Sequence, residues 1–111
     1  MPTTNTVVLH VSDRPEDVAR AIDSAHTLHA NRPAYRIRII VNGPALRGAT
    51  VDGAPLDLSR LPEGAGIEAC EVGMRSRGIP TDTLQAGVRT TASAVVALSE
   101  AQLAGAAYVR I

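Results

Sequence analysis

The chain contains one cysteine, Cys70, and this is the residue with the most specific chemical potential. It lies near the end of residues 66–72, a short stretch that predicts a β-strand, and Arg75 and Arg77 follow closely. In open α/β sheets, ligands and reacting groups gather beyond the carboxyl ends of the strands. A thiolate is favoured there by positive charge and by helix N-termini. Cys70 is therefore a candidate nucleophile, and Arg75 and Arg77 are expected to stabilise its anionic sulfur.

A structural role for Cys70 stays open beside this reading. Glu68 and Glu71 are closer in sequence than the arginines, and their negative charges oppose formation of a thiolate. Many free cysteines also pack in cores as small apolar side chains. The sequence does not decide between a reactive and a structural cysteine.

Two other segments carry polar residues that belong with this site. His10 lies inside a β-branched run and could orient the thiol if its strand neighbours that of Cys70; otherwise it is a core histidine with a hydrogen-bonded ring nitrogen. Asn42 and Gly43 follow a second apolar run, where they either shape a pocket or form a turn that needs positive φ. His26 and His29 lie one helical turn apart, but no further ligand completes a recognisable set, so we predict no metal site.

The strands that must position these residues are read from β-branched and alternating runs. They are expected at residues 6–11, 35–42, 66–72, 87–91 and 106–111.

Helices are expected between most of these strands. Asp13 as N-cap and Glu16 three residues later resemble a capping box, and the apolar stripe that follows comprises Val18, Ile22, Ala25 and Leu28, ending near residue 31. Short helices are expected near residues 45–48 and 56–61, and a single turn within 79–84. A last helix, capped by Ser93, should run to about residue 103. This alternation predicts one domain over residues 1–111, a mainly parallel sheet with helices on both faces.

Composition excludes several classes of function. The net charge is zero, and the sequence contains no lysine, which excludes Schiff-base and P-loop lysine chemistry. No basic run and only two aromatic residues are present, so no nucleic-acid partner is expected. No apolar stretch is long enough to span a bilayer, and a single cysteine suits a reducing compartment, so we expect a cytoplasmic protein without membrane association. No phosphate-binding loop is present, so no flavin, nucleotide or other cofactor is expected.

Several segments together resemble a known family. They are Ile40-Val41-Asn42-Gly43-Pro44-Ala45, residues 66–71, residues 74–79, Gly87-Val88-Arg89, residues 93–98 and the terminal residues 105–111. In order and spacing they are similar to the DsrE/DsrF-like family, in its small stand-alone branch. That branch often has a polar Asn-Thr pair two and three residues after the cysteine, where this chain has Val72 and Gly73.

The resemblance implies a three-layer α/β sandwich with a five-stranded, mainly parallel sheet. It also implies assembly into homo-oligomers, as dimers, trimers or hexamers. Characterised members of the family carry sulfane sulfur as a cysteine persulfide. The expected function is thus a sulfur carrier that uses Cys70 and exchanges sulfur with a donor or acceptor protein. The alternative is a non-catalytic homo-oligomeric protein that binds a small ligand or a partner and in which Cys70 is structural.

Overall fold

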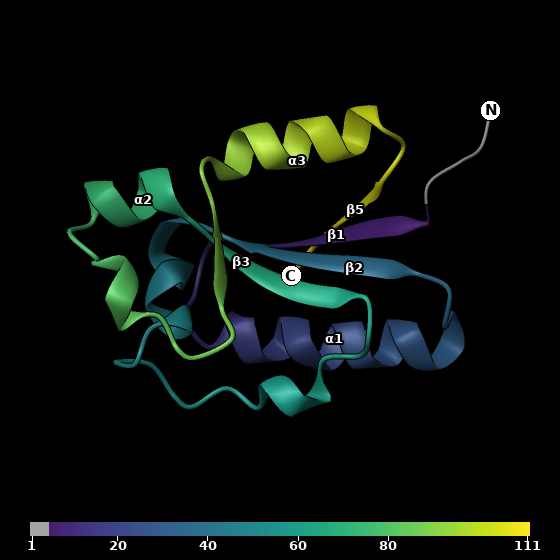
Figure 1. Cartoon of the computed structure of the whole chain (residues 1–111), viewed down its shortest axis with the longest axis horizontal. Coiled ribbons are helices and arrows are strands. Elements are labelled where there is room, and N and C mark those ends of the chain that lie inside the picture. The colour runs from purple at the N-terminus through teal and green to yellow at the C-terminus, as the bar shows by residue number, and fades with distance from the viewer. Residues whose placement is uncertain (1–4) are drawn as a thin grey trace.

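A computed structural model describes residues 5–111 and contains a five-stranded sheet (Figure 1). The strands are β1 (Thr6–Val11), β2 (Arg36–Val41), β3 (Ala65–Cys70), β4 (Arg89–Thr91) and β5 (Ala107–Arg110). Their order across the sheet is β4-β3-β2-β1-β5, and every neighbouring pair is parallel. This confirms the expected α/β class, its five strands and its parallel sheet.

Helices cover both faces of the sheet. Figure 1 shows α1 (Asp17–Asn31) along one face and α3 (Ala94–Leu103) along the other, with α2 (Glu71–Ser76) beyond the end of β3. Three short 3-10 helices complete the elements: η1 (Gly43–Ala49), η2 (Leu58–Arg60) and η3 (Thr81–Thr83). The layers are therefore helix, sheet and helix, as predicted.

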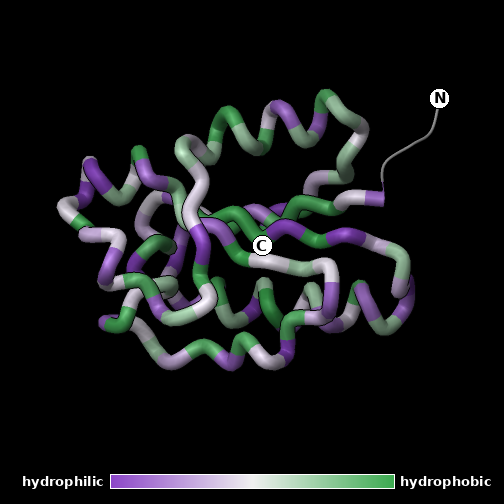
Figure 2. The backbone as a smooth tube through the Cα atoms, in the orientation of Figure 1, coloured by the Kyte–Doolittle hydropathy of each residue, from purple (hydrophilic) through white to green (hydrophobic). Residues whose placement is uncertain are grey.

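The core has two parts because alternate residues of a strand face opposite sides of the sheet. On the α1 side, Leu9 and Ile39 pack against the predicted stripe of α1, in which Val18, Ile22 and Ala25 are buried. On the α3 side the core is smaller and comprises Val8, Ile40, Cys70, Ala94 and Leu98. Figure 2 shows the corresponding apolar segments along the central strands and α3.

The predicted capping box of Asp13 and Glu16 is wrong, because α1 begins after both residues. α1 starts at Asp17 after a turn, and the residue at its N-cap, Glu16, makes no side-chain capping bond. Asp13 instead accepts a hydrogen bond from Arg110 at 2.9 Å. Asp17 is buried and lies within 3.2 Å of both Arg14 and Arg20. The Asp13 side chain, which local spacing assigned to the N-cap, therefore binds Arg110 of β5 instead.

Four strands are shorter than expected, and β2 and β5 are each shorter by one residue at either end. β3 ends at Cys70 rather than at residue 72, because Cys70 is the N-cap of α2 and the next two residues are already helical. β4 begins at Arg89, because Gly87 has a φ of 92° and belongs to the preceding turn. Within residues 5–111, no helix is long and apolar enough to cross a membrane.

Gly48 marks a close backbone approach between η1 and the start of α1. A Cβ at this position would lie 2.1 Å from the carbonyl oxygen of Pro15, whereas a Cβ at Gly66 would meet no atom within 4 Å. We predict that Gly48→Ala lowers the free energy of unfolding by at least about 1–3 kcal/mol, as overpacking does. Gly66→Ala should leave it unchanged or raise it by about 0.5–1 kcal/mol. Urea denaturation of both variants measures this, and equal stabilities would contradict the close approach.

Ionisation of Asp17 should make the stability of the fold depend on pH in the acid range. Its hydrogen bond with Arg14, and then that with Arg20, hold the pKa of the Asp17 carboxyl below its ordinary value of 3.8, although desolvation opposes them. A lowered folded-state pKa contributes stability that is complete above the unfolded value and is lost as pH falls below it. Asp17→Asn should therefore flatten the loss of stability below about pH 4. Thermal melts of wild type and variant between neutral and acid pH measure this, and parallel curves would contradict it.

Candidate functional site

Cys70 lies where β3 passes directly into α2, and its sulfur accepts two backbone hydrogen bonds. The N–H of Gly73, in the first turn of α2, is 3.5 Å from Sγ, and the N–H of Ala94, the first residue of α3, is 3.2 Å away. The first turns of helices have N–H groups without intrahelical acceptors and carry partial positive charge. We call Cys70 with these two N–H groups the sulfur cradle. Both donors are backbone N–H groups at the starts of helices.

The cradle is enclosed by apolar side chains. Only 5% of the surface of Cys70 is exposed, and it packs with Val8, Ile40 and Leu98 between the sheet and α3. Cys70 therefore has both the amide donors of a reactive thiol and the packing of a core residue.

The two glutamates that flank Cys70 are engaged by other groups. Glu68 receives two hydrogen bonds from Arg38, each of 2.8 Å, and this pairing raises the pKa of the Arg38 guanidinium. Glu71 accepts a hydrogen bond from the Thr90 hydroxyl at 2.6 Å. The charge of Glu68, which sequence reasoning set against a thiolate, is thus balanced by an arginine from β2.

Arg75 and Arg77 do not reach the sulfur. Arg75 is in the last turn of α2 and Arg77 follows it, whereas Cys70 is at the other end of this helix. Both arginines are exposed, and no hydrogen bond or ion pair joins them to Cys70 within the part of the chain that the structure describes. The donors that do reach Sγ are backbone groups, which no sequence motif marks, and Ala94 is 24 residues away.

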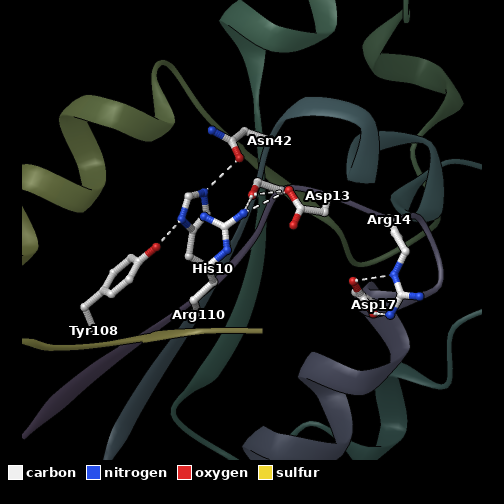
Figure 3. A network of polar contacts seen from close by, with 8 residues as sticks. His10, Asp13, Arg14, Asp17, Asn42, Tyr108 and Arg110 are labelled. Atoms are coloured by element: carbon white, nitrogen blue, oxygen red, sulfur yellow. Dashed lines mark hydrogen bonds and ion pairs between the residues drawn. The ribbon is translucent and has the colours of Figure 1, made fainter.

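His10 and Asn42 form a hydrogen-bonded network with Tyr108, as Figure 3 shows. His10 Nε2 is 2.8 Å from Asn42 Oδ1, and His10 Nδ1 is 2.6 Å from the Tyr108 hydroxyl. Because a carbonyl oxygen only accepts, Nε2 must carry the hydrogen. In the neutral ring, Nδ1 then accepts the hydrogen bond that Tyr108 donates. The network fixes one tautomer of His10.

The sheet order separates His10 from Cys70. β2 lies between β1 and β3, so the condition for His10 to orient the thiol directly, that the two strands be neighbours, is not met. Asn42 follows directly after Val41, which is paired with Ala69, so its place is at the strand end between His10 and Cys70. The structure thus brings together two of the candidate site residues, His10 and Asn42, with Asn42 on the side of the cysteine.

Gly43 allows the chain to leave β2 sharply. Its φ is 60°, and a Cβ here would lie 2.7 Å from the carbonyl oxygen of Ser12. The expected positive-φ turn is therefore confirmed at this residue. Its position keeps the ends of β1 and β2 close together beside Asn42.

Arg110 adds a second polar group next to the network, also visible in Figure 3. Its Nη2 donates to Ser12 Oγ at 3.0 Å and to Asp13 Oδ1 at 2.9 Å, and it lowers the pKa of the Asp13 carboxyl. The sequence analysis did not identify Tyr108 and Arg110 as site residues, because both lie on β5, far from His10 and Asp13 in the sequence. Only its pairing with β1 brings them to His10 and Asp13.

A groove of about 380 Å³ borders the sulfur cradle. Its lining includes Thr91, Ala92 and Ser93, and the next residue, Ala94, donates to Sγ. Among residues 5–111, no three or more histidine, cysteine and acidic side chains are grouped to hold a metal ion. His26 and His29 lie on α1, on the opposite side of the sheet from Cys70.

Comparisons with known proteins identify the fold. No family model matches the chain, and no curated protein matches it. A protein of unknown function, MTH1491 from Methanobacterium thermoautotrophicum, has a similar structure with a TM-score of 0.79 and 25% identity, over 96% of this chain and 98% of that chain. The ychN protein from E. coli has a TM-score of 0.72 and 18% identity, over 96% of this chain and 99% of that chain. The chain shares its fold with both over nearly its full length.

We predict that NMR of the imidazole nitrogens will show neutral His10 with its hydrogen on Nε2. Tyr108→Phe should shift the Nδ1 resonance, because the hydroxyl donor is lost, and should lower the free energy of unfolding by about 0.5–1.5 kcal/mol. Tyr35→Phe is the matched control, because Tyr35 makes no side-chain hydrogen bond with the described residues. An Nδ1–H tautomer, or equal shifts in both variants, would refute the network.

Proposed function

We propose that this chain is a sulfur carrier of the DsrE/DsrF-like type, in which Cys70 holds a persulfide. The observation that carries this proposal is the sulfur cradle, where two backbone N–H groups from two helix starts point at one sulfur. A persulfide at neutral pH is anionic, as a thiolate is, and the same N–H groups stabilise both. The cradle is at the carboxyl end of β3, where α/β proteins place their reacting groups.

Sulfur transfer in this scheme needs one cysteine and no external oxidant. The Cys70 thiolate attacks the terminal sulfur of a donor persulfide, R–S–SH. The new S–S bond forms as the donor's S–S bond breaks, and the donor leaves as the thiolate R–S⁻ with the electron pair. An acceptor thiolate then attacks the terminal sulfur on Cys70 and releases the Cys70 thiolate. Oxidation states are exchanged between the partners with no net redox change.

Other residues have supporting roles in the proposal. His10 holds Asn42 Oδ1, which leaves the amide nitrogen of Asn42 to offer N–H groups at the strand end nearest Cys70. Gly43, which has no side chain, lets the ends of β1 and β2 lie close together beside Asn42. Arg75 and Arg77, exposed on and after α2, offer positive charge to a donor or acceptor protein rather than to the sulfur. The carrier acts in the cytoplasm as a homo-oligomer.

The burial of Cys70 favours a second function, that of a non-catalytic homo-oligomeric protein with a structural cysteine. With 5% of its surface exposed, Cys70 has little contact with solvent. The two functions differ in whether the native thiol reacts, so one set of measurements separates them.

The first measurement is mass spectrometry of the native protein after incubation with a sulfane-sulfur donor. We expect an adduct of about 32 Da on Cys70, the mass of one sulfur atom. Cys70→Ser should show none. A thiol that is modified only after denaturation would sink the carrier proposal and leave the structural one.

A second prediction tests the cradle itself. Ala94→Pro removes the N–H that donates to Sγ, and proline is well tolerated at the first position of a helix. The preceding residue, Ser93, is already extended, with φ −148° and ψ 122°, as a residue before proline requires. The rate of native alkylation at neutral pH should fall about tenfold or more, because a hydrogen bond to a charged group contributes about 1.5–3 kcal/mol.

Ala94→Ser is the matched control, because it keeps the backbone N–H and should keep the rate. Circular dichroism should show that both variants retain the helix. Equal alkylation rates in the two variants would show that the N–H of Ala94 does not activate the sulfur.

A further inference from the structure

The face of the sheet that α3 packs on is covered over only part of its length. α3 covers this face at the level of Cys70, Val8 and Ile40. Alternate residues of a strand share a face, so Glu68 and Gly66 precede Cys70 in the same row of β3. A Cβ at Gly66 would meet no atom within 4 Å. Because parallel sheets are normally covered on both faces, the uncovered end of this row has room for a further group.

Two grooves lie at this part of the sheet, and Arg38 lines both. The first, of about 380 Å³, is the groove that borders the sulfur cradle, and its lining includes Val96 and Glu100 of α3. The second, of about 530 Å³, has Gly66 and Arg89 in its lining. Both volumes are typical of sites for small ligands. We call the two grooves together the β3 groove.

Two opposite charges in the β3 groove have no ion-pair partner among residues 5–111. Arg38 and Glu68 neutralise each other through two hydrogen bonds of 2.8 Å. Arg89 lies in register with Glu68, but neither Arg89 nor Glu100 takes part in an ion pair. The groove therefore has one cation from β4 and one anion from α3 to offer. A small ligand with one carboxylate and one ammonium group matches both charges.

The β3 groove also lies next to the sulfur. Thr91 is in its lining and is the register partner of Cys70. Glu68 precedes Cys70 by two residues, which is about 7 Å along a strand. A ligand held by Arg89 and Glu100 thus lies beside the sulfur cradle, and a sulfur-bearing ligand is the kind that the chemistry of Cys70 can use.

We propose that the β3 groove binds a free thiol amino acid, and that the persulfide of this amino acid is the sulfur donor to Cys70. Arg89 binds the carboxylate, Glu100 binds the ammonium group, and the sulfur-bearing side chain extends toward Cys70. With the amino acid as R, the Cys70 thiolate bonds to the terminal sulfur of R–S–SH, the S–S bond of the donor breaks, and R–S⁻ leaves. The transfer step rests on the proposed function, whereas binding in the groove does not require Cys70.

NMR titration of the Cys70→Ser protein tests binding apart from sulfur transfer. S-methylcysteine has both charged groups and an unreactive sulfur, and we expect it to shift resonances of residues in the β3 groove. 3-(Methylthio)propionate lacks the ammonium group and 2-(methylthio)ethylamine lacks the carboxylate, so each should bind about tenfold more weakly or less. Absence of S-methylcysteine binding, or equal binding of the three compounds, would overturn the proposal.

Charge-removing variants locate the site. Arg89→Gln and Glu100→Gln should each weaken binding of S-methylcysteine about tenfold. Arg47→Gln is the matched control, because Arg47 is also exposed and makes no ion pair within the described part of the chain, but lies on η1, away from the groove. Circular dichroism should show all three variants to be folded. Equal affinities in Arg89→Gln and Arg47→Gln would contradict binding at this place.

Rates of persulfide formation on Cys70 separate this proposal from the proposed function. Arg89→Gln should slow transfer from cysteine persulfide about tenfold and leave transfer from the uncharged 2-mercaptoethanol persulfide unchanged. Equal rates in wild type and Arg89→Gln with both donors would retain the carrier and exclude the groove as its donor site. Binding of S-methylcysteine without an adduct from either donor would exclude the carrier and retain only the amino-acid site.

Discussion

The parallel pairing of β1, β2 and β3, with both faces buried, is the constraint on which the rest of the structure depends. Val8 and Ile40 are fully buried on the α3 side, and Leu9 and Ile39 are buried on the α1 side. A register shift of one residue would turn every one of these side chains to the opposite face. The register is therefore strongly determined, and with it the place of each strand end. His10, Asn42 and Cys70 therefore lie at the same edge of the sheet, with β2 between the strands of His10 and Cys70.

That edge contains two different kinds of polar structure. The sulfur cradle is made by backbone N–H groups, whose positions follow from where α2 and α3 begin. The network of His10, Asn42 and Tyr108 is made by side chains whose positions follow from the strand register. Asn42 is the residue between them, since it bonds to His10 and follows the strand that pairs with β3.

α3 links the site to the surface of the molecule. Its first N–H bonds to the Cys70 sulfur, its inner side packs on Val8 and Ile40, and its outer side displays Val95 and Leu103.

The sequence by itself determined the elements and their approximate limits. Local periodicity identified the five strands and the buried stripe of α1, and the Ser93 cap was found because its side chain bonds to the N–H of Val96 within the same turn. The position of Cys70 near a strand end was also readable, and the positive φ of Gly43 belongs to one of the two interpretations that the sequence left open there. These features depend on residues a few positions apart, and local sequence records them directly.

The tertiary structure alone decided which residues meet. Pairing of β5 with β1 joins residues 98 positions apart, and it brings Tyr108 to His10 and takes Asp13 from its expected capping role to Arg110. The packing of α3 on the sheet places the N–H of Ala94 against the Cys70 sulfur. The direction of α2 places Arg75 and Arg77 at the end of that helix far from the sulfur. Such contacts arise from burial of whole strands and helices. No local pattern encodes them, because the energy that selects them belongs to the packed sheet and its two helical layers rather than to any one segment.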